Sequence, residues 1–285
     1  MHDYTHYSLD HKREKSLEYL FKSADSKGLL WPLLTVPTCT DLVCMYDADD
    51  VYIINPVTRQ EITLPKNSSD WFNQKVAFGY DASTSEYKVF RFICSAQFSI
   101  ACEVFTLGGS NSWRRVKTLD ELDLLDDITM IDGSVYAMIK RFYETYYCIF
   151  RFDLENEEWS KLPLPKADEF HPDEVTSFFS LNQAAGVLCL TCLVPCKRFE
   201  IWLLKDHCKD GEHNPWVKDY SIDISTLRYG NSVQLLAIEE DGRVVVQLGD
   251  FFCYNPKSRS FEEIYVGTTG FGATFYVESF MSLNM

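Results

Sequence analysis

A short pattern that recurs along the chain limits its possible folds more than any other feature. In each copy an aromatic and apolar run leads into a polar turn, and a second strand-like run follows. The clearest copy extends from Phe150 to Pro165, and Trp159 begins its second run. The turns of the copies begin at Asn55, Leu107, Asp153, Lys205 and Asn255, which are separated by 52, 46, 52 and 50 residues. A fixed period near ~50 residues indicates that one structural unit is repeated.

A second hairpin signal lies between the copies. Strand-like runs are separated by short turns that begin at Asp81, Asp132, Asn182 and Asp241, again about one period apart. Two of these turns contain Asp-Gly, which is the strongest short-range signal for a β-hairpin. Two hairpins per period give four strands per repeat, as in the blade of a β-propeller. The sequence therefore predicts an all-β, kelch-like β-propeller.

The pattern also predicts how many blades there are. Four full blades are expected at residues 75–118, 128–165, 175–224 and 231–266. Residues 42–65 supply only three strands, and we expect the C-terminal strand at 272–280 to complete this blade and close the propeller. Closure matters because an open propeller leaves unpaired strand edges. The expected total is five four-stranded blades, or six if residues 5–9 and 29–36 add a partial one.

The first residues depart from the repeat. Residues 5–9 are compatible with a short strand. Residues 10–21 are charged, with Leu17, Leu20 and Phe21 at helical spacing, so a helical turn and an irregular cap both remain open. We therefore divide the chain into an irregular, partly helical segment at 1–40, packed on or leading into the propeller, and the propeller at 41–285.

Charge and composition exclude several classes of partner. The net charge is −15, and the chain has no basic stripe of the kind that binds nucleic acid or an acidic membrane surface. No apolar run reaches the ~18 residues of a membrane-spanning helix, and the first residues lack the pattern of a signal peptide. We expect a soluble cytoplasmic or nuclear protein, in which the ten cysteines are reduced.

The sequence shows little sign of catalytic or metal chemistry. It has no Gly-x-Ser-x-Gly turn, and its six histidines fall near the N-terminus or in expected loops. Cys189 and Cys192, with Cys196 further on, are the best metal candidates. Cys189 and Cys192 are an odd number of residues apart in a strand-like run, so their side chains should point to opposite faces. We therefore expect no catalytic residues, no metal and no cofactor.

Aromatic residues recur at one position in each repeat, at Trp113, Trp159, Trp216 and Phe261. Periodic apolar positions are usually core positions. We expect these rings to anchor one blade against the next rather than to bind a ligand.

The loops differ between the two ends of the expected blades. The loops between the second and third strands, and those between blades, are long and rich in aromatic and basic residues. Such residues are common in interface hot spots, and loops on a rigid scaffold often carry recognition. We expect a partner-binding face that contains Trp71, Phe72, Phe98, Arg141, Phe142, Tyr143, Phe170, His171, Arg198, Arg228 and Tyr229.

Several phrases together resemble the plant F-box-associated domain, a kelch-like propeller found C-terminal to an F-box. They include Asn55-Pro-Val-Thr-Arg59, Phe78-Gly-Tyr-Asp81, Phe199-Glu-Ile-Trp202 and Tyr254-Asn-Pro256, and they occur in the family's order over about residues 40–265. The resemblance implies a non-enzymatic module that presents a protein substrate to a Skp-cullin-F-box ubiquitin ligase.

The resemblance ends at the front of the chain, where no segment of this sequence looks like the helical F-box that docks the Skp adaptor. Binding of the Skp adaptor is therefore expected only if an F-box is supplied elsewhere. Two alternatives remain open. One is a decoy or scaffold without an F-box that binds the same partner, and the other is a propeller enzyme.

Overall fold

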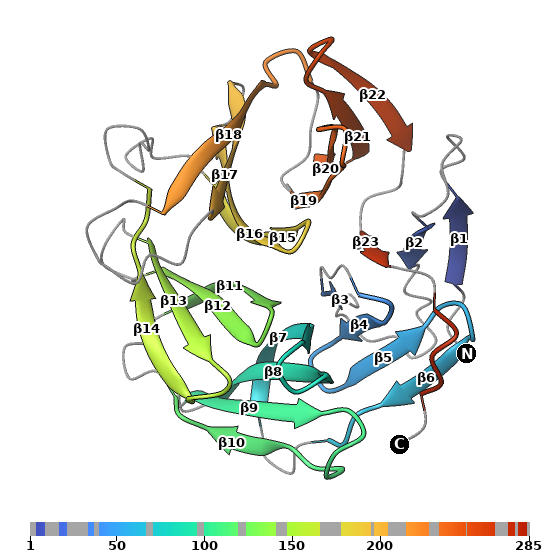
Figure 1. Ribbon diagram of the computed structural model, residues 1–285, viewed down its shortest axis with the longest axis vertical. Helices are drawn as coiled ribbons and strands as arrows, with labels where there is room; N and C mark the ends of the chain where they lie inside the picture. Colours follow the sequence, from blue (N-terminus) through green and yellow to red (C-terminus); the bar gives the residue numbers. More distant parts are fainter. Residues whose placement is uncertain are drawn as a thin grey trace. The chain divides into compact units, whose positions relative to one another are not determined.

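The chain is described by a computed structural model in which twenty-three strands, and no helix, occur among the described residues. These are residues 4–8, 17–21, 34–36, 40–66, 71–95, 100–118, 124–140, 147–165, 178–194, 197–204, 215–227, 234–248, 250–265, 273–276 and 279–283. The described strands form five four-stranded sheets and one three-stranded sheet (Figure 1). Contacts divide the chain into two compact units, residues 1–118 with 264–285, and residues 119–263.

The first unit contains three antiparallel sheets. One four-stranded sheet consists of β3 (Leu34–Thr35), β4 (Val43–Tyr46), β5 (Val51–Asn55) and β6 (Gln60–Thr63). The next consists of β7 (Trp71–Asp81), β8 (Glu86–Ser95), β9 (Ile100–Thr106) and β10 (Arg114–Val116). The three-stranded sheet joins the two ends of the chain, through β1 (Tyr4–Ser8), β2 (Leu17–Phe21) and β23 (Ala273–Tyr276).

The second unit contains three four-stranded sheets, each with its strands in sequence order. The first has β11 (Leu124–Ile131), β12 (Ser134–Lys140), β13 (Tyr147–Asp153) and β14 (Glu158–Leu162). The second has β15 (Phe178–Ala184), β16 (Val187–Val194), β17 (Arg198–Leu204) and β18 (Trp216–Asp223). The third has β19 (Gln234–Ile238), β20 (Val244–Leu248), β21 (Asp250–Asn255) and β22 (Ser260–Tyr265).

The five four-stranded sheets confirm the five blades that the sequence predicted, but the expected use of the C-terminal strand was wrong in detail. β23 does not complete the first blade; it pairs with β2, with Leu17 opposite Tyr276. The fourth strand of the first blade is β3, which pairs with β4. β3 has two residues, too few for an alternating pattern to appear in the sequence.

The N-terminal segment is extended where the structure describes it. β1 confirms the short strand expected near residues 5–9. Residues 17–21 form strand β2 rather than the helical turn or irregular cap that the sequence left open. Residues 9–16 and 22–33 lie outside the described part, and the division of the chain at residue 40 stays a prediction.

Apolar side chains fill the space between neighbouring blades. Along β4, Cys44 and Tyr46 pack in a cluster with Phe78 of β7, while Val43 and Met45 pack with Ile54 in a different cluster. This alternation follows from the two-residue period of a strand. In the second unit one cluster joins β12 to β16, and another joins β17 to β20. Each blade therefore contributes to a core that it cannot complete alone.

The repeated turn has one construction in three blades. An Asn or Asp side-chain oxygen accepts hydrogen bonds from the two backbone amides that lie two and three residues further on, at Asn55, Asp153 and Asn255. Four residues after each of them the backbone enters the left-handed region, with φ of 57° at Arg59, 56° at Glu157 and 53° at Arg259. Such side-chain-to-backbone bonds favour turns. The periodic polar residues of the sequence thus fix where each strand ends.

Two of the periodic tryptophans, Trp113 and Trp216, connect blades, as predicted. The indole nitrogen of Trp113, just before β10, donates to the carbonyl oxygen of Pro65 after β6, at 2.7 Å. Trp216 of β18 makes the same bond to Pro163 after β14, also at 2.7 Å. Phe261 packs on the core shared by the last two blades. Trp159 contacts Phe152 of its own blade, with ring centroids 4.9 Å apart and the ring planes tilted by 45°, so for Trp159 the expected contact between blades stays a prediction.

Replacing Trp216 with Phe tests the contribution of this bond. The change keeps most of the apolar ring and removes the donor to Pro163, so the free energy of unfolding should fall by about 1–3 kcal/mol. Urea unfolding followed by circular dichroism measures the fall. Val217→Ala is a suitable control because Val217 is 42% exposed, and it should change the value by less than about 0.5 kcal/mol. Equal decreases in the free energy of unfolding for Trp216→Phe and Val217→Ala would show that the hydrogen bond from Trp216 to Pro163 contributes nothing to stability.

Candidate functional site

Most of the predicted partner-binding face cannot be compared with the structure. Phe98, Arg141, Phe142, Tyr143, Phe170, His171, Arg228 and Tyr229 lie outside the described residues. For Trp71 and Phe72 the structure describes only the backbone, at the start of β7. Arg198 is the one predicted residue whose side chain is described. The face stays a prediction.

Arg198 lies at the start of β17 and belongs to a cluster of charges. Its Nε lies 2.9 Å from Oε1 of Glu200, and Nζ of Lys218 lies 3.2 Å from the same oxygen. The Glu200 side chain is only 6% exposed, whereas both cationic side chains are 32% exposed. A buried carboxylate needs such partners. Arg198 therefore has a structural role, whatever else it contacts.

The cysteines do not form a metal site in the described part of the chain. Cys189 packs in the core between the last two blades, and Cys192 packs in the core on the other face of β16. The predicted opposite orientation is confirmed. Among the described residues, no three His, Cys, Asp or Glu side chains are grouped to hold a metal ion. Cys196 lies outside the described residues.

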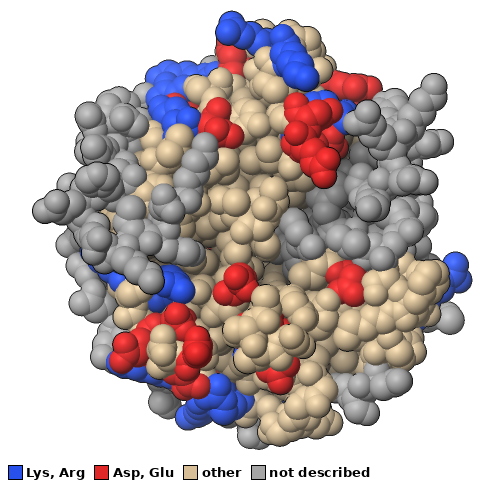
Figure 2. Space-filling model, viewed as in Figure 1, with Lys and Arg blue, Asp and Glu red and all other residues tan. Residues whose placement is uncertain are grey.

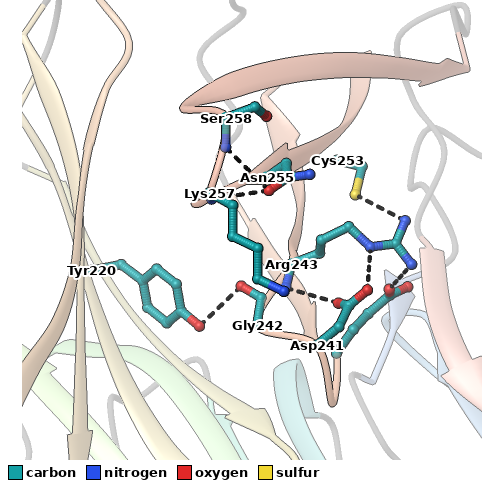
Figure 3. A network of polar contacts seen from close by, with 9 residues as sticks. Tyr220, Asp241, Gly242, Arg243, Cys253, Asn255, Lys257 and Ser258 are labelled. Carbon is teal, nitrogen blue, oxygen red and sulfur yellow. Dashed lines mark hydrogen bonds and ion pairs between the residues drawn. The ribbon is translucent and has the colours of Figure 1, made fainter.

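A polar network holds the hairpin between β19 and β20 (Figure 3). Arg243 lies between Glu239 and Asp241, with N···O distances of 2.5 and 2.9 Å, and its third nitrogen points to the Cys253 sulfur. The hydrogen bond to Asp241 raises the pKa of Arg243. The Tyr220 hydroxyl donates to the carbonyl oxygen of Gly242 at 3.0 Å. The network therefore fixes the turn. The guanidinium of Arg243 is used in these internal contacts.

Charge on the surface is mixed rather than of one sign. Figure 2 shows acidic side chains in several separate groups on the face in view, with basic side chains beside some of them. The acidic excess of the chain, 42 Asp and Glu against 27 Lys and Arg, therefore leaves local sites where a carboxylate is not balanced. One such site adjoins a pocket in the first unit.

This pocket, which we call the tail pocket, lies between the first two blades and the C-terminal segment 279–283, and has a volume of about 450 Å³. Its apolar lining comes from Ile62, Tyr80, Tyr87, Leu107, Met281 and Leu283. Its polar lining includes Ser85, Glu86 and Ser282. The residues come from β6, the β7–β8 hairpin, the β9–β10 turn and the tail, so the pocket depends on tertiary structure.

The tail forms one wall because Asn55 and Gln60 hold it. The Asn55 amide donates to the carbonyl oxygens of Ser279 and Met281, at 3.1 and 2.7 Å. The side-chain oxygen Oε1 of Gln60 accepts from the Leu283 backbone amide at 2.8 Å. Figure 1 shows this C-terminal segment beside β5 and β6. Asn55 thus both shapes its own turn and binds the tail.

One carboxylate at the tail pocket is incompletely balanced. Lys88 lies 2.6 Å from Asp81 and 3.7 Å from Glu86, and the side chains of Lys88 and Asp81 are only 11% and 4% exposed. Burial by itself would raise the pKa of Asp81, but hydrogen bonds from Lys88, Ser83 and Thr84 lower it to about 2. Lys88 is therefore the close partner of Asp81. Glu86 is 42% exposed and has Lys88 only at the longer distance.

Aromatic rings and apolar side chains line the tail pocket itself. The rings of Tyr80 and Tyr87 lie 5.0 Å apart, and Tyr80 is 39% exposed. The Tyr87 hydroxyl donates to Asp41, and burial followed by this bond raises the pKa of Tyr87. Phe280 of the tail is 87% exposed and Met281 is 39% exposed. Sequence reasoning missed this site, although apolar residues beyond the last strand were a signal for it.

The repeated four-stranded sheets, with cores between successive blades, define an all-β protein of the propeller class. The sequence comparisons identify the family. A model of the F-box associated beta propeller domain matches residues 4–280, and the chain belongs to this family.

The relatives include two Arabidopsis thaliana proteins named as F-box proteins. At1g32420 is 28% identical over 170 residues, which are 58% of this chain and 54% of that protein. At3g07870 is 22% identical over 305 residues, which are 90% of this chain and 71% of that protein. The chain spans about half the length of the first of these relatives.

Two solved structures share the fold. A mutant of AofleA from Arthrobotrys oligospora has a TM-score of 0.54 at 11% identity, covering 93% of this chain and 83% of that one. The SapL1 lectin in complex with alpha methyl fucoside has a TM-score of 0.53 at 10% identity, covering 87% and 91%. At this identity the likeness shows the fold alone. In the described part of the chain, no helix is long and apolar enough to span a membrane.

The Asp81–Lys88 pair should make stability depend on acid pH. The pKa of Asp81 is about 2 in the folded chain and about 3.9 when unfolded, so its stabilising effect is complete above pH ~5 and is lost as the pH falls toward ~2. The effect amounts to about 2–3 kcal/mol. In Asp81→Asn this pH-dependent part should be absent, and an additional loss should follow because Lys88 stays buried.

Urea unfolding at several values between about pH 3 and pH 7 measures this effect. The difference between the wild type and Asp81→Asn should narrow as the pH falls. Glu158→Gln removes one exposed carboxylate in the second unit and should show no comparable narrowing. If the difference in the free energy of unfolding between the wild type and Asp81→Asn stayed constant with pH, the lowered pKa of Asp81 would be wrong.

Replacing Asn55 with Asp should release the tail without removing the turn. The carboxylate can still accept from the amides of Val57 and Thr58, but it faces the carbonyl oxygens of Ser279 and Met281 without a donor. We expect hydrogen exchange at the Leu283 amide to accelerate by about tenfold or more, because two hydrogen bonds are lost and each costs about 1–1.5 kcal/mol.

Asn255→Asp is the matched control, because Asn255 makes the same turn in another blade. It should leave exchange at Leu283 unchanged. Unchanged exchange in Asn55→Asp would mean that the tail is held by other contacts.

Proposed function

We propose that this chain is a non-enzymatic, protein-binding propeller that recognises the substrate of a Skp-cullin-F-box ubiquitin ligase. The observation that carries the proposal is the family match over residues 4–280, a range that contains every described strand. The relatives' names add that such domains occur in F-box proteins. In that arrangement the F-box binds the Skp adaptor and the propeller binds the protein to be modified.

The described geometry supports binding rather than catalysis. The strongly buried charges are paired within the blades, as Arg91 is with Glu103 at 2.7 Å and Lys88 is with Asp81 at 2.6 Å. Such pairs hold strands together and are not aimed at a shared cavity. The tail pocket instead combines partly exposed apolar side chains, such as those of Tyr80 and Met281, with polar lining residues, which is typical of a recognition surface.

Partners and location follow from the proposed role. The substrate is a protein, and the Skp adaptor would join through an F-box supplied outside the matched domain. The proposed place of action is the cytoplasm or nucleus, where such ligases meet their substrates. No nucleic acid, membrane or cofactor is part of this proposal.

A chimera with an F-box tests the function directly. The F-box of At3g07870 is fused before this chain, and the chimera and the chain alone are used to capture proteins from plant extract. The chimera should recover the Skp adaptor and cullin together with further proteins. The chain alone should recover those further proteins without the adaptor. A reconstituted ligase containing the chimera should ubiquitinate at least one of them.

Two results would contradict the proposal. One is recovery of the adaptor by the chain alone, which would contradict the claim that the adaptor joins only through an F-box supplied elsewhere and would also exclude the decoy without an F-box. The other is a chimera that binds the adaptor but captures and ubiquitinates nothing else. The F-box fused to an unrelated propeller serves as the control for capture through the F-box.

A further inference from the structure

Three charged side chains lie in register across the second blade, the sheet that contains β7 to β10. Arg115 of β10 is opposite Glu103 of β9, which in turn is opposite Arg91 of β8. Residues directly opposite one another on neighbouring strands share a face of the sheet. The distances agree, because the Glu103 carboxylate lies 2.7 Å from Nη2 of Arg91 and 3.6 Å from Nε of Arg115. Toward β10, the row therefore reads cation, carboxylate, cation.

The outer cation of this row is incompletely balanced. Two nitrogens of Arg91 lie 3.0 and 2.7 Å from Oε2 of Glu103, and the Arg91 side chain is only 3% exposed. Arg115 has Glu103 at the longer distance, and its side chain is 70% exposed. Arg91 is therefore the close partner of the carboxylate. Two cations and one carboxylate leave one positive charge, located on Arg115.

The row ends at an open edge of the sheet. β9 is the one strand with which β10 pairs in the described part of the chain, so β10 is the outermost strand of its blade (Figure 1). Residues 114–117 carry three cations and no carboxylate. Each of the other four outer strands, β6, β14, β18 and β22, contains at least one Asp or Glu. An open edge exposes backbone donors and acceptors that can pair with a strand from another chain.

The repeat shows that this arrangement is particular to the second blade. Arg115 lies two residues after the periodic Trp113, and Lys161 and Lys218 lie at the same distance after Trp159 and Trp216. Lys161 of β14 is opposite the apolar Phe150, so no row of charge leads to it.

Lys218 of β18 is paired within its own blade. Its Nζ hydrogen-bonds to Glu200 at 3.2 Å, and its side chain is 32% exposed, less than half the exposure of Arg115. Of these three cations, Arg115 thus combines the greatest exposure with the longest distance to its carboxylate.

We propose that the outer edge of β10 binds an acidic, extended segment of a protein partner, which adds to the sheet as a strand and places a carboxylate opposite Arg115. This rests on the proposed function, because it names the chemistry that the substrate presents. The new carboxylate continues the alternation of the row, and opposite charges directly across a strand pair stabilise the pairing. The chain as a whole has a net charge of −15, so an acidic segment is attracted only where cations are concentrated locally, as they are at residues 114–117.

Selection from a library of random short peptides displayed on phage tests the proposal without knowledge of the partner. Peptides enriched on the wild-type chain should contain Asp or Glu among residues that favour strands. Synthetic versions of the best peptides, with Asn in place of Asp or Gln in place of Glu, should bind about fivefold more weakly by fluorescence anisotropy.

Methylation of the peptide's backbone nitrogens, one at a time, distinguishes an added strand from an isolated ion pair. A strand at a sheet edge directs alternate amides toward its neighbour. Methylation should therefore weaken binding by about tenfold at every second position, where a hydrogen bond to β10 is lost, and much less at the positions between them.

Variants of the chain complete the test. Arg115→Gln should weaken binding of the acidic peptides by about fivefold and should abolish the difference between the acidic peptides and their amide versions. Lys161→Gln is the matched control, because it removes one exposed cation from the same position of another outer strand. It should leave the affinity unchanged. Unfolding midpoints of both variants identify any loss that comes from misfolding.

Four results would overturn the proposal. They are the enrichment of peptides without Asp or Glu, the failure of any peptide to be enriched, equal losses from Arg115→Gln and Lys161→Gln, and methylation losses that do not alternate. The chimera separates this failure from failure of the proposed function. If Arg115→Gln in the chimera captures and ubiquitinates the same proteins as the wild type, the ligase role stands and the binding site at β10 is wrong.

Discussion

The packing of one blade against the next is the interaction on which the rest of this structure depends. Each blade is a four-stranded sheet with apolar side chains on both faces, and a single sheet has nothing to cover them. The rings of Trp113 and Trp216 show how the contact is made specific. A Trp ring buries about 150–250 Å², worth about 4–6 kcal/mol before the entropy cost is counted. The indole N–H then selects one carbonyl of the preceding blade, Pro65 or Pro163.

Charged residues in the strands follow from the same constraint. Arg91 of β8 is nearly buried, and its two nitrogens lie 3.0 and 2.7 Å from one oxygen of Glu103 on β9. Its guanidinium carbon also lies 3.6 Å from the centre of the Trp113 ring. A charge between blades is tolerated only with such partners. Side chains that stay open to solvent are therefore found at strand ends and in the tail, as Glu86 and Phe280 are.

Much of this arrangement was predictable from the sequence, because its causes are local and repeated. Alternating side chains, turn-forming Asn and Asp, and one aromatic ring per repeat gave the blades, and strand parity placed Cys189 and Cys192 in different cores. The partnership of β23 with β2 was not predictable, since more than 250 residues separate the two strands. The tail pocket was missed for the same reason. Asn55 looks like a turn residue, and its bonds to Ser279 and Met281 span 224 and 226 positions.

The tail couples the pocket to the stability of the first blade. Met281 and Leu283 line the pocket, and the same segment is held by Asn55 and Gln60. A ligand that contacts Met281 therefore binds only the state in which the tail is docked. Mass action then requires that the ligand stabilise the docked tail by as much as docking strengthens its binding. Asn55, which contacts no ligand in this scheme, becomes a positioning residue. Loss of the hydrogen bonds from Asn55 to the tail increases the fraction of molecules in which the tail is undocked and the pocket lacks this wall. The apparent affinity of the pocket for a ligand falls by that fraction.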